Sequence, residues 1–159
     1  MLNMYVSIEG YNYQYKGTKS NNNEPCIVLV HNMNKGTLKT LDYALDISAN
    51  IIALHVSRTP QHTEILEKQW KELGIGVPLT VITAPHRDVL QSLMEYITNY
   101  EEKLGKGENL TVVLTKYIGN WKYRIFHNQT SLFIENQLSR HKNSVTVLVP
   151  YVYTKNSGK

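Results

Sequence analysis

Five short apolar runs divide this chain, and each has the length and composition of a buried strand. Continuous runs of Val, Ile and Leu are typical of strands that are covered on both faces. We expect the strands at Ile27–Val30, Ile51–Val56, Leu79–Thr83, Leu110–Leu114 and Val145–Val149. The intervals between them are long enough to hold helices.

Helical periodicity fills these intervals. Apolar residues recur there at three- and four-residue spacing, which is typical of an amphipathic helix. The patterns cover Leu38–Ile47, Leu66–Leu73, Val89–Tyr100 and Tyr123–Leu138. Thr37 and Asp88 are expected as N-caps of the first and third helices, and Asn50 as a C-cap of the first.

The alternation of strands and helices predicts an α/β fold. Strands joined through helices form a parallel sheet covered on both sides, with right-handed crossovers. We therefore expect a three-layer sandwich with a five-stranded, mostly parallel sheet. Ligands bind such sheets outside the carboxyl ends of the strands, where the strand order reverses. The loops that matter are His31–Gly36, Ala84–Asp88 and Thr115–Thr130.

The N-terminal segment differs from the rest of the chain. Residues 1–24 have no clean periodicity and contain the polar run Ser20–Asn23. This composition favours a partly disordered linker or leader, and its tyrosines leave room for a short docking strand. We expect the domain at residues 25–153 and a tail at 154–159.

Composition narrows the classes of function and the compartment. A chain of 159 residues is expected to form one domain. Its net charge of +4 suits an anionic ligand or membrane surface, but the basic residues are too scattered to predict a nucleic-acid partner. The single cysteine, Cys26, is expected as a buried side chain in a cytoplasmic protein. No apolar run approaches the roughly 18 residues of a membrane span, and the N-terminus has no signal-peptide pattern.

Neither catalysis nor metal binding is predicted. The sequence contains no nucleophile elbow, no Walker A motif and no paired carboxylates, so we expect no enzyme. His31, His55, His86 and His127 lack the spacing of zinc ligands, and no metal site is expected. His55 lies inside a predicted strand and is interpreted as a core or edge histidine with satisfied hydrogen bonds.

The strongest candidate for a binding site is a polar segment at the start of the fourth helical pattern. Helix N-termini bind anions because their first N–H groups are free and the helix dipole is positive there. The segment consists of His127, Asn128, Gln129, Thr130 and Ser131. Helix capping is the alternative, but capping alone does not require five polar residues.

Arg87 is a second candidate for holding phosphate. It follows a proline and precedes the third helix, at the same expected edge of the sheet. Its guanidinium can grip phosphate oxygens in a bidentate manner. A surface arginine paired with Asp88 or Glu95 is the alternative interpretation.

The order of the elements and the segment Val30–Ala44 resemble the universal stress protein family, which has an adenine nucleotide alpha hydrolase-like fold. Nucleotide-binding members of that family hold phosphate with a glycine-spaced motif after the fourth strand. Here Gly119 stands alone, and His127–Ser131 occupies the place of the clamp. The resemblance implies that His31, Asn32 and Val56 line the adenine and ribose region.

A narrower resemblance covers roughly residues 25–153. The segments that carry it are similar to the cytosolic C-terminal domain of bacterial APC-superfamily permeases, which include KimA-type potassium importers and amino-acid permeases. These segments are Asn34–Ala44, Ala84–Arg87, Leu110–Val113, Trp121, His127–Thr130 and Val147–Tyr151. The resemblance implies a dimeric domain that follows the last membrane helix and senses cyclic di-AMP.

The favoured hypothesis is a regulatory nucleotide-binding domain of a membrane transporter, at the cytosolic face of the membrane. Cyclic di-AMP is the expected ligand, with Asn128–Ser131 on its phosphates and Arg87 neutralising their charge; no further cofactor is expected. A homodimer is expected through Val145–Val149, whose edge would otherwise stay unpaired. The alternatives are a free-standing stress protein that binds ATP or AMP, and a ligand-free dimerisation module of a permease.

Overall fold

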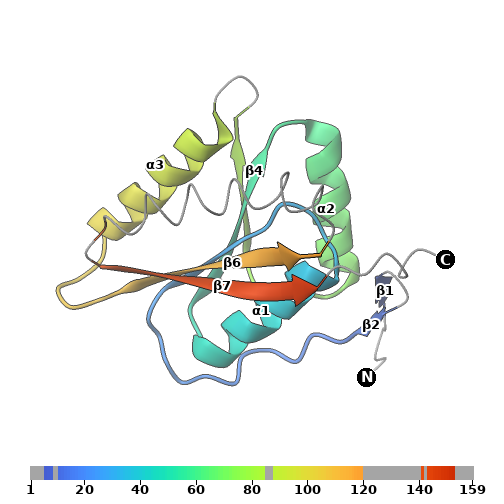
Figure 1. Cartoon of the computed structure of the whole chain (residues 1–159), viewed down its shortest axis with the longest axis horizontal. Coiled ribbons are helices and arrows are strands. Elements are labelled where there is room, and N and C mark those ends of the chain that lie inside the picture. Colours follow the sequence, from blue (N-terminus) through green and yellow to red (C-terminus); the bar gives the residue numbers. More distant parts are fainter. Residues whose placement is uncertain (1–5, 9–10, 85–87, 120–140, 142, 153–159) are drawn as a thin grey trace.

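A five-stranded, all-parallel sheet forms the centre of the molecule (Figure 1). The computed structural model describes residues 6–8, 11–84, 88–119, 141 and 143–152. The strands are β3 (Cys26–Leu29), β4 (Ile51–Ser57), β5 (Leu79–Thr83), β6 (Leu110–Ile118) and β7 (Ser144–Val152). They lie in the order β5-β4-β3-β6-β7, and every neighbouring pair is parallel. The predicted α/β class and parallel sheet are confirmed.

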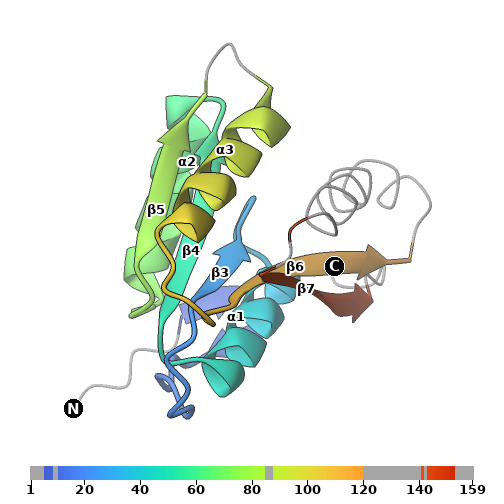
Figure 2. The ribbon, with the colours of Figure 1, turned by 90° about the vertical axis from the view of Figure 1, so that its left-hand side faces the viewer.

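Helices cover both faces of this sheet (Figure 2). Helices α1 (Lys35–Ile47) and α2 (Pro60–Glu72) pack on one face, against a core that includes Val28, Ala53 and Val113. Helix α3 (Val89–Glu102) packs on the other face, against Ile27 and Leu54. Adjacent strand residues alternate between the two cores because side chains on a strand point to opposite faces. The arrangement is consistent with the predicted three-layer sandwich.

The order in which the chain adds strands to the sheet reverses at β3. From β3 the chain crosses to β4 and then to β5; it returns to β6 on the other side of β3 and continues to β7. Val28 of β3 is in register with both Ala53 of β4 and Val113 of β6. The carboxyl end of β3 therefore lies beside β6, which continues further to Ile118, and this is the switch point, where α/β sheets bind ligands.

The tyrosine-rich N-terminal segment packs on the domain. Strands β1 (Val6–Ile8) and β2 (Tyr11–Tyr13) form an antiparallel pair. Tyr13 is 2% exposed and belongs to the same core as helices α1 and α2. Further along, the Thr18 hydroxyl donates to the carbonyls of Leu45 and Ser48 at 3.1 and 3.0 Å. These contacts hold the segment along α1.

Two of the three predicted helix caps are wrong, and the third is confirmed. Asn34, not Thr37, is the N-cap of α1, and its Oδ1 accepts the Thr37 N–H at 2.9 Å. Ser48, not Asn50, is the C-cap of the same helix. Asp88 caps α3 as predicted, accepting the Leu90 N–H at 2.9 Å. The prediction of Thr37 was wrong because the helix begins earlier, at Lys35, so that Thr37 is its third residue and Asn34 takes the N-cap position.

The last two strands are longer than predicted. Strand β6 continues to Ile118, although the apolar run ends at Leu114. It pairs with β7 along its whole length, from Leu110↔Ser144 to Ile118↔Val152. Residues 115–118 were predicted to lie in a loop, and the pairing with β7 corrects this.

Candidate functional site

A buried network of polar side chains connects the loop after β3 to strand β6 at the switch point. Asn34 is 7% exposed and Tyr117 of β6 is 8% exposed. The Asn34 Nδ2 donates to the Tyr117 hydroxyl and to Asn32 Oδ1, both at 2.9 Å, and the Tyr117 hydroxyl lies 3.1 Å from Asn34 Oδ1. The network thus fixes the loop after β3 to the end of β6. Buried polar groups that are satisfied in this way hold a single conformation.

The first turn of α1 lies directly on β6 beneath this network. The hydroxyls of Thr40 and Thr115 are 2.6 Å apart, and Thr40 also donates to the Gly36 carbonyl at 2.9 Å. A Cβ at Gly36 would lie 2.9 Å from Cε1 of Tyr117 and 3.1 Å from Cγ2 of Thr115. Only glycine allows the helix backbone to approach β6 this closely.

Three of the predicted site residues lie at the same edge of the sheet. His31 is exposed and Asn32 is half-buried, both in the loop that follows β3. Val56 is near the end of β4, half-buried on the face that α3 covers. The Val30 N–H donates to the Leu54 carbonyl at 2.9 Å, so the ends of β3 and β4 stay together. The loop and the end of β4 are therefore neighbours, but the Val56 side chain belongs to the α3 core.

The other predicted site residues are outside the described residues. These are Arg87, His127, Asn128, Gln129, Thr130 and Ser131. The strand that leads towards Arg87 ends at the same edge, because Thr83 of β5 is in register with Ser57 of β4. Asp88, which follows Arg87, is the N-cap of α3.

His55 is a core histidine with satisfied hydrogen bonds, as predicted. It is 0% exposed; its Nδ1 lies 2.9 Å from the Val30 carbonyl oxygen, and its Nε2 lies 3.3 Å from the Thr63 hydroxyl. Burial lowers the pKa of His55 below the ordinary value, although the bond to Val30 opposes this. Neighbouring His62 also lowers this pKa, and Glu67 raises it.

Cys26 is a buried thiol, also as predicted. It is 1% exposed, and burial raises its pKa to about 12. A thiol with so high a pKa stays protonated at neutral pH, and only the thiolate is a strong nucleophile or metal ligand. Across the described ranges, no three His, Cys, Asp or Glu side chains are grouped so that they could hold a metal ion.

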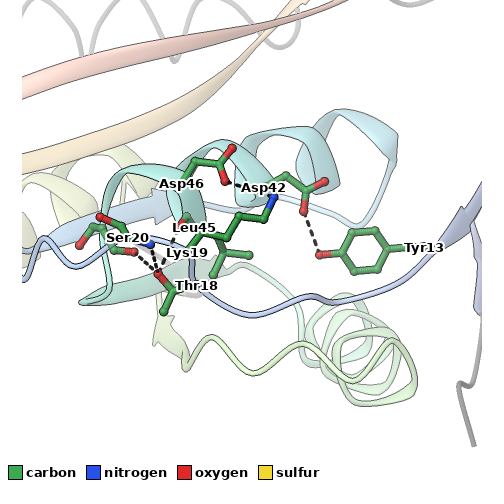
Figure 3. Close-up of polar contacts among 8 residues, drawn as sticks. Tyr13, Thr18, Lys19, Ser20, Asp42, Leu45 and Asp46 are labelled. Carbon is green, nitrogen blue, oxygen red and sulfur yellow. Dashed lines mark hydrogen bonds and ion pairs between the residues drawn. The ribbon is translucent and has the colours of Figure 1, made fainter.

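A polar cleft of about 420 Å³ lies between the N-terminal segment and α1. The Tyr13 hydroxyl donates to Asp42 Oδ1 at 3.3 Å, and the Lys19 Nζ is 3.8 Å from Asp46 Oδ1 (Figure 3). Burial raises the pKa of Asp42, and burial together with Asp42 raises that of Tyr13. Both carboxylates in this cleft therefore interact with groups of the N-terminal segment, which they help to hold on α1.

Sequence reasoning missed the central pair of the switch point, Asn34 and Tyr117. The signal for Asn34 was its position three residues before Thr37, since an N-cap accepts the N–H of the second or third helical residue. The signal for Tyr117 was the β-prone run after Leu114, which extends the strand.

Comparisons with known proteins show the family of this chain. The family described as the KimA potassium transporter C-terminal domain matches residues 21–151. The potassium transporter KimA of Bacillus subtilis (strain 168) is 27% identical over 119 residues, which are 74% of this chain and 20% of that protein. The chain thus spans about a fifth of the length of this relative. In the described part of the chain, no helix is long and apolar enough to cross a membrane. The chain belongs to the family of KimA potassium transporter C-terminal domains.

Proposed function

We propose that this chain is a regulatory domain at the cytosolic face of a potassium transporter, and that it binds an adenine nucleotide at the carboxyl edge of its sheet. The observation that carries the proposal is the buried bond between Asn34 and Tyr117. It holds the loop after β3 in one conformation at the switch point, where a ligand would bind. A preformed loop lowers the entropic cost of binding.

The proposed site combines groups from several strand ends. Asn32 and His31 would contact adenine and ribose with polar groups, whereas the Val56 side chain packs against the α3 core and is left out of the proposed contacts. Arg87 and the segment Asn128–Ser131 would hold the phosphates through charge and hydrogen bonds. The net charge of +4 favours an anionic ligand.

Cyclic di-AMP is the nucleotide that we propose. The glycine-spaced clamp that holds the phosphates of ATP in universal stress proteins is replaced here by the side-chain amides and hydroxyls of His127–Ser131. Side chains of this kind suit a phosphodiester, which carries one negative charge per phosphate, better than a triphosphate chain. Binding would then bias the conformation of the transporter only if the nucleotide prefers one state of the domain.

Calorimetric titration of the chain with cyclic di-AMP, ATP and AMP tests this proposal. We expect binding of cyclic di-AMP, and Arg87→Ala should weaken it by about 1.5–3 kcal/mol, the scale of a hydrogen bond to a charged group. Arg58→Ala is the matched control, because Arg58 is an exposed arginine that follows β4 at the same edge. Heat with ATP but none with cyclic di-AMP would overturn the choice of ligand. No heat with any of the three would favour a ligand-free module.

We also propose that two copies of the chain associate through β7. This strand is at one end of the sheet, and its nine residues carry no charged side chain. Val145 is 51% exposed. A long, uncharged edge strand readily pairs with another chain, and monomeric proteins usually protect such an edge with charges. The outer edge of β7 therefore suits a second copy.

Sedimentation velocity of Val145→Lys checks the proposed dimer. We expect the unmodified chain to sediment as a dimer and Val145→Lys to shift it towards the monomer, because each copy would place a charge at the shared edge. Ile65→Lys is the control, since Ile65 is 58% exposed on α2, away from β7. A dimer that tolerates both substitutions equally would place the interface elsewhere.

A further inference from the structure

Three histidine rings contact one another in a row from the surface to the interior. His31 lies in the loop after β3, His62 in the first turn of α2, and His55 on β4. The ring centroids of His31 and His62 are 5.3 Å apart in a tilted contact, and those of His62 and His55 are 5.5 Å apart in an edge-to-face contact. His31 is exposed, His62 is half-buried, and His55 is 0% exposed. These ring contacts join the loop after β3 to the start of α2.

The hydrogen bonds around His55 extend to the start of α2. The Val30 carbonyl can only accept, so His55 Nδ1 carries a proton and donates to it, while Nε2 lies 3.3 Å from the Thr63 hydroxyl oxygen. The Thr63 hydroxyl donates to the Ser57 hydroxyl, and Ser57 donates to the carbonyl of Thr59, the N-cap of α2, at 3.3 Å. A second proton on His55 would sit on Nε2, facing Thr63, and would therefore place a charge at one end of this series of hydrogen bonds.

The surroundings of His55 disfavour its charged form. Strand β3 offers it the Val30 carbonyl, and α2 offers the Thr63 hydroxyl, the His62 ring and, further away, the Glu67 carboxylate. Its two hydrogen-bond partners are uncharged. Burial outweighs the favourable bond to Val30 and lowers the pKa of His55. Water must reach this ring before the charge becomes tolerable.

The direction of the pH effect follows from the lowered pKa. An unfolded histidine binds a proton near pH 6.5, whereas the folded His55 binds one only at lower pH. As the pH falls through this window, the open or unfolded chain binds more protons than the closed one. The contribution of neutral His55 to stability is therefore complete above the window and is lost below it.

We propose that His31, His62 and His55 form an acid-sensitive clasp between the loop after β3 and the first turn of α2. At neutral pH the contacts between the rings hold the two segments together. A second proton on His55 places a charge against the His62 ring in a buried position, and hydration of His55 then separates the start of α2 from the sheet. The same loop carries Asn32, so acid would also weaken nucleotide binding; this last consequence rests on the proposed function.

Proton NMR of the histidine rings in the full chain, combined with amide shifts, tests the clasp. As the pH falls below about 6.5, we expect the amides of residues 31–34 and 61–63 to shift together with the titration of His55. His62→Gln should raise the midpoint of the His55 titration, and Glu67→Gln should lower it. His141→Gln is the control, because His141 contacts Glu101 at the far end of α3 and should leave His55 unchanged. The clasp is wrong if His55 titrates alike with and without His62, or if the amides do not follow it.

Nucleotide affinity at the same pH values separates the clasp from the proposed function. If cyclic di-AMP binds, we expect its affinity to fall as His55 becomes protonated. Absence of binding at every pH would overturn the nucleotide site, while the NMR titration would still decide the clasp. Binding that stays constant through the His55 titration would show that the loop is not coupled to the site.

Discussion

Asn34→Ala is expected to lower the free energy of unfolding by about 1.5–5 kcal/mol. Loss of an N-cap accounts for about 0.5–2 kcal/mol of this, because the Thr37 N–H loses its acceptor. The remainder, about 1–3 kcal/mol, comes from the hydrogen bonds with Asn34 that the Tyr117 hydroxyl loses. Urea unfolding followed by circular dichroism measures the change.

Asp88→Ala is the matched control for this prediction. Asp88 also caps a helix through one N–H bond, but it is exposed and lies at the start of α3. Its replacement should cost about 0.5–2 kcal/mol, the cost of a cap alone. Equal losses at the two positions would mean that the link between Asn34 and Tyr117 contributes nothing to stability. A larger loss at Asn34 measures that link directly.

The strands of this fold could be predicted because burial on both faces leaves a simple pattern. Ile27–Val30 was predicted where β3 covers Cys26–Leu29, and Leu79–Thr83 matches β5. An apolar run can be recognised in the sequence without knowing which strands pair with it in the sheet. The end of β6 was harder, because residues 115–118 mix polar and apolar types and are held in the strand by pairing with β7.

The contacts that build the switch point could not be predicted in this way. Asn34 and Tyr117 are 83 residues apart, and no local pattern connects them. Asn34 and Thr37 are both able to cap a helix, and each takes a different role only in the folded chain. Thr37 donates its hydroxyl to the Asn32 carbonyl at 2.7 Å, while Asn34 caps the helix.

The contacts among His31, His62 and His55 show the same limit. His31 and His55 were recognised as separate residues, one in a loop and one in a strand. His62 was missed because the apolar pattern of α2 became visible only at Leu66, although the helix begins at Pro60. Proline at the first helical position is a recognised signal of a helix start. Pro60 indicates that His62 lies in the first turn of a helix, but it does not indicate that His62 contacts His55.

Ile97→Ala is expected to lower the free energy of unfolding by about 2–5 kcal/mol, the range for large-to-small changes in a packed core. Ile97 is 0% exposed at the centre of the interface between α3 and the sheet. Its neighbours there include Ile27 of β3 and Leu110 of β6. Ile27 and Leu110 lie at the amino ends of their strands, so the cavity would form away from the carboxyl ends that carry the candidate site. Urea unfolding is again the measurement.

Two further variants make this test specific to packing. Ile97→Val removes one methyl group and should cost about 0.5–1.5 kcal/mol. Ile65→Ala makes the same chemical change on α2 at a side chain that is 58% exposed, and surface changes of this kind usually stay within about 0.5 kcal/mol. A graded loss at position 97 with little change at 65 requires that α3 is packed against the sheet as the third layer. Equal losses for Ile97→Ala and Ile65→Ala would contradict the sandwich. Truncation of the fully buried Ile97 should lower the free energy of unfolding more than truncation of the exposed Ile65.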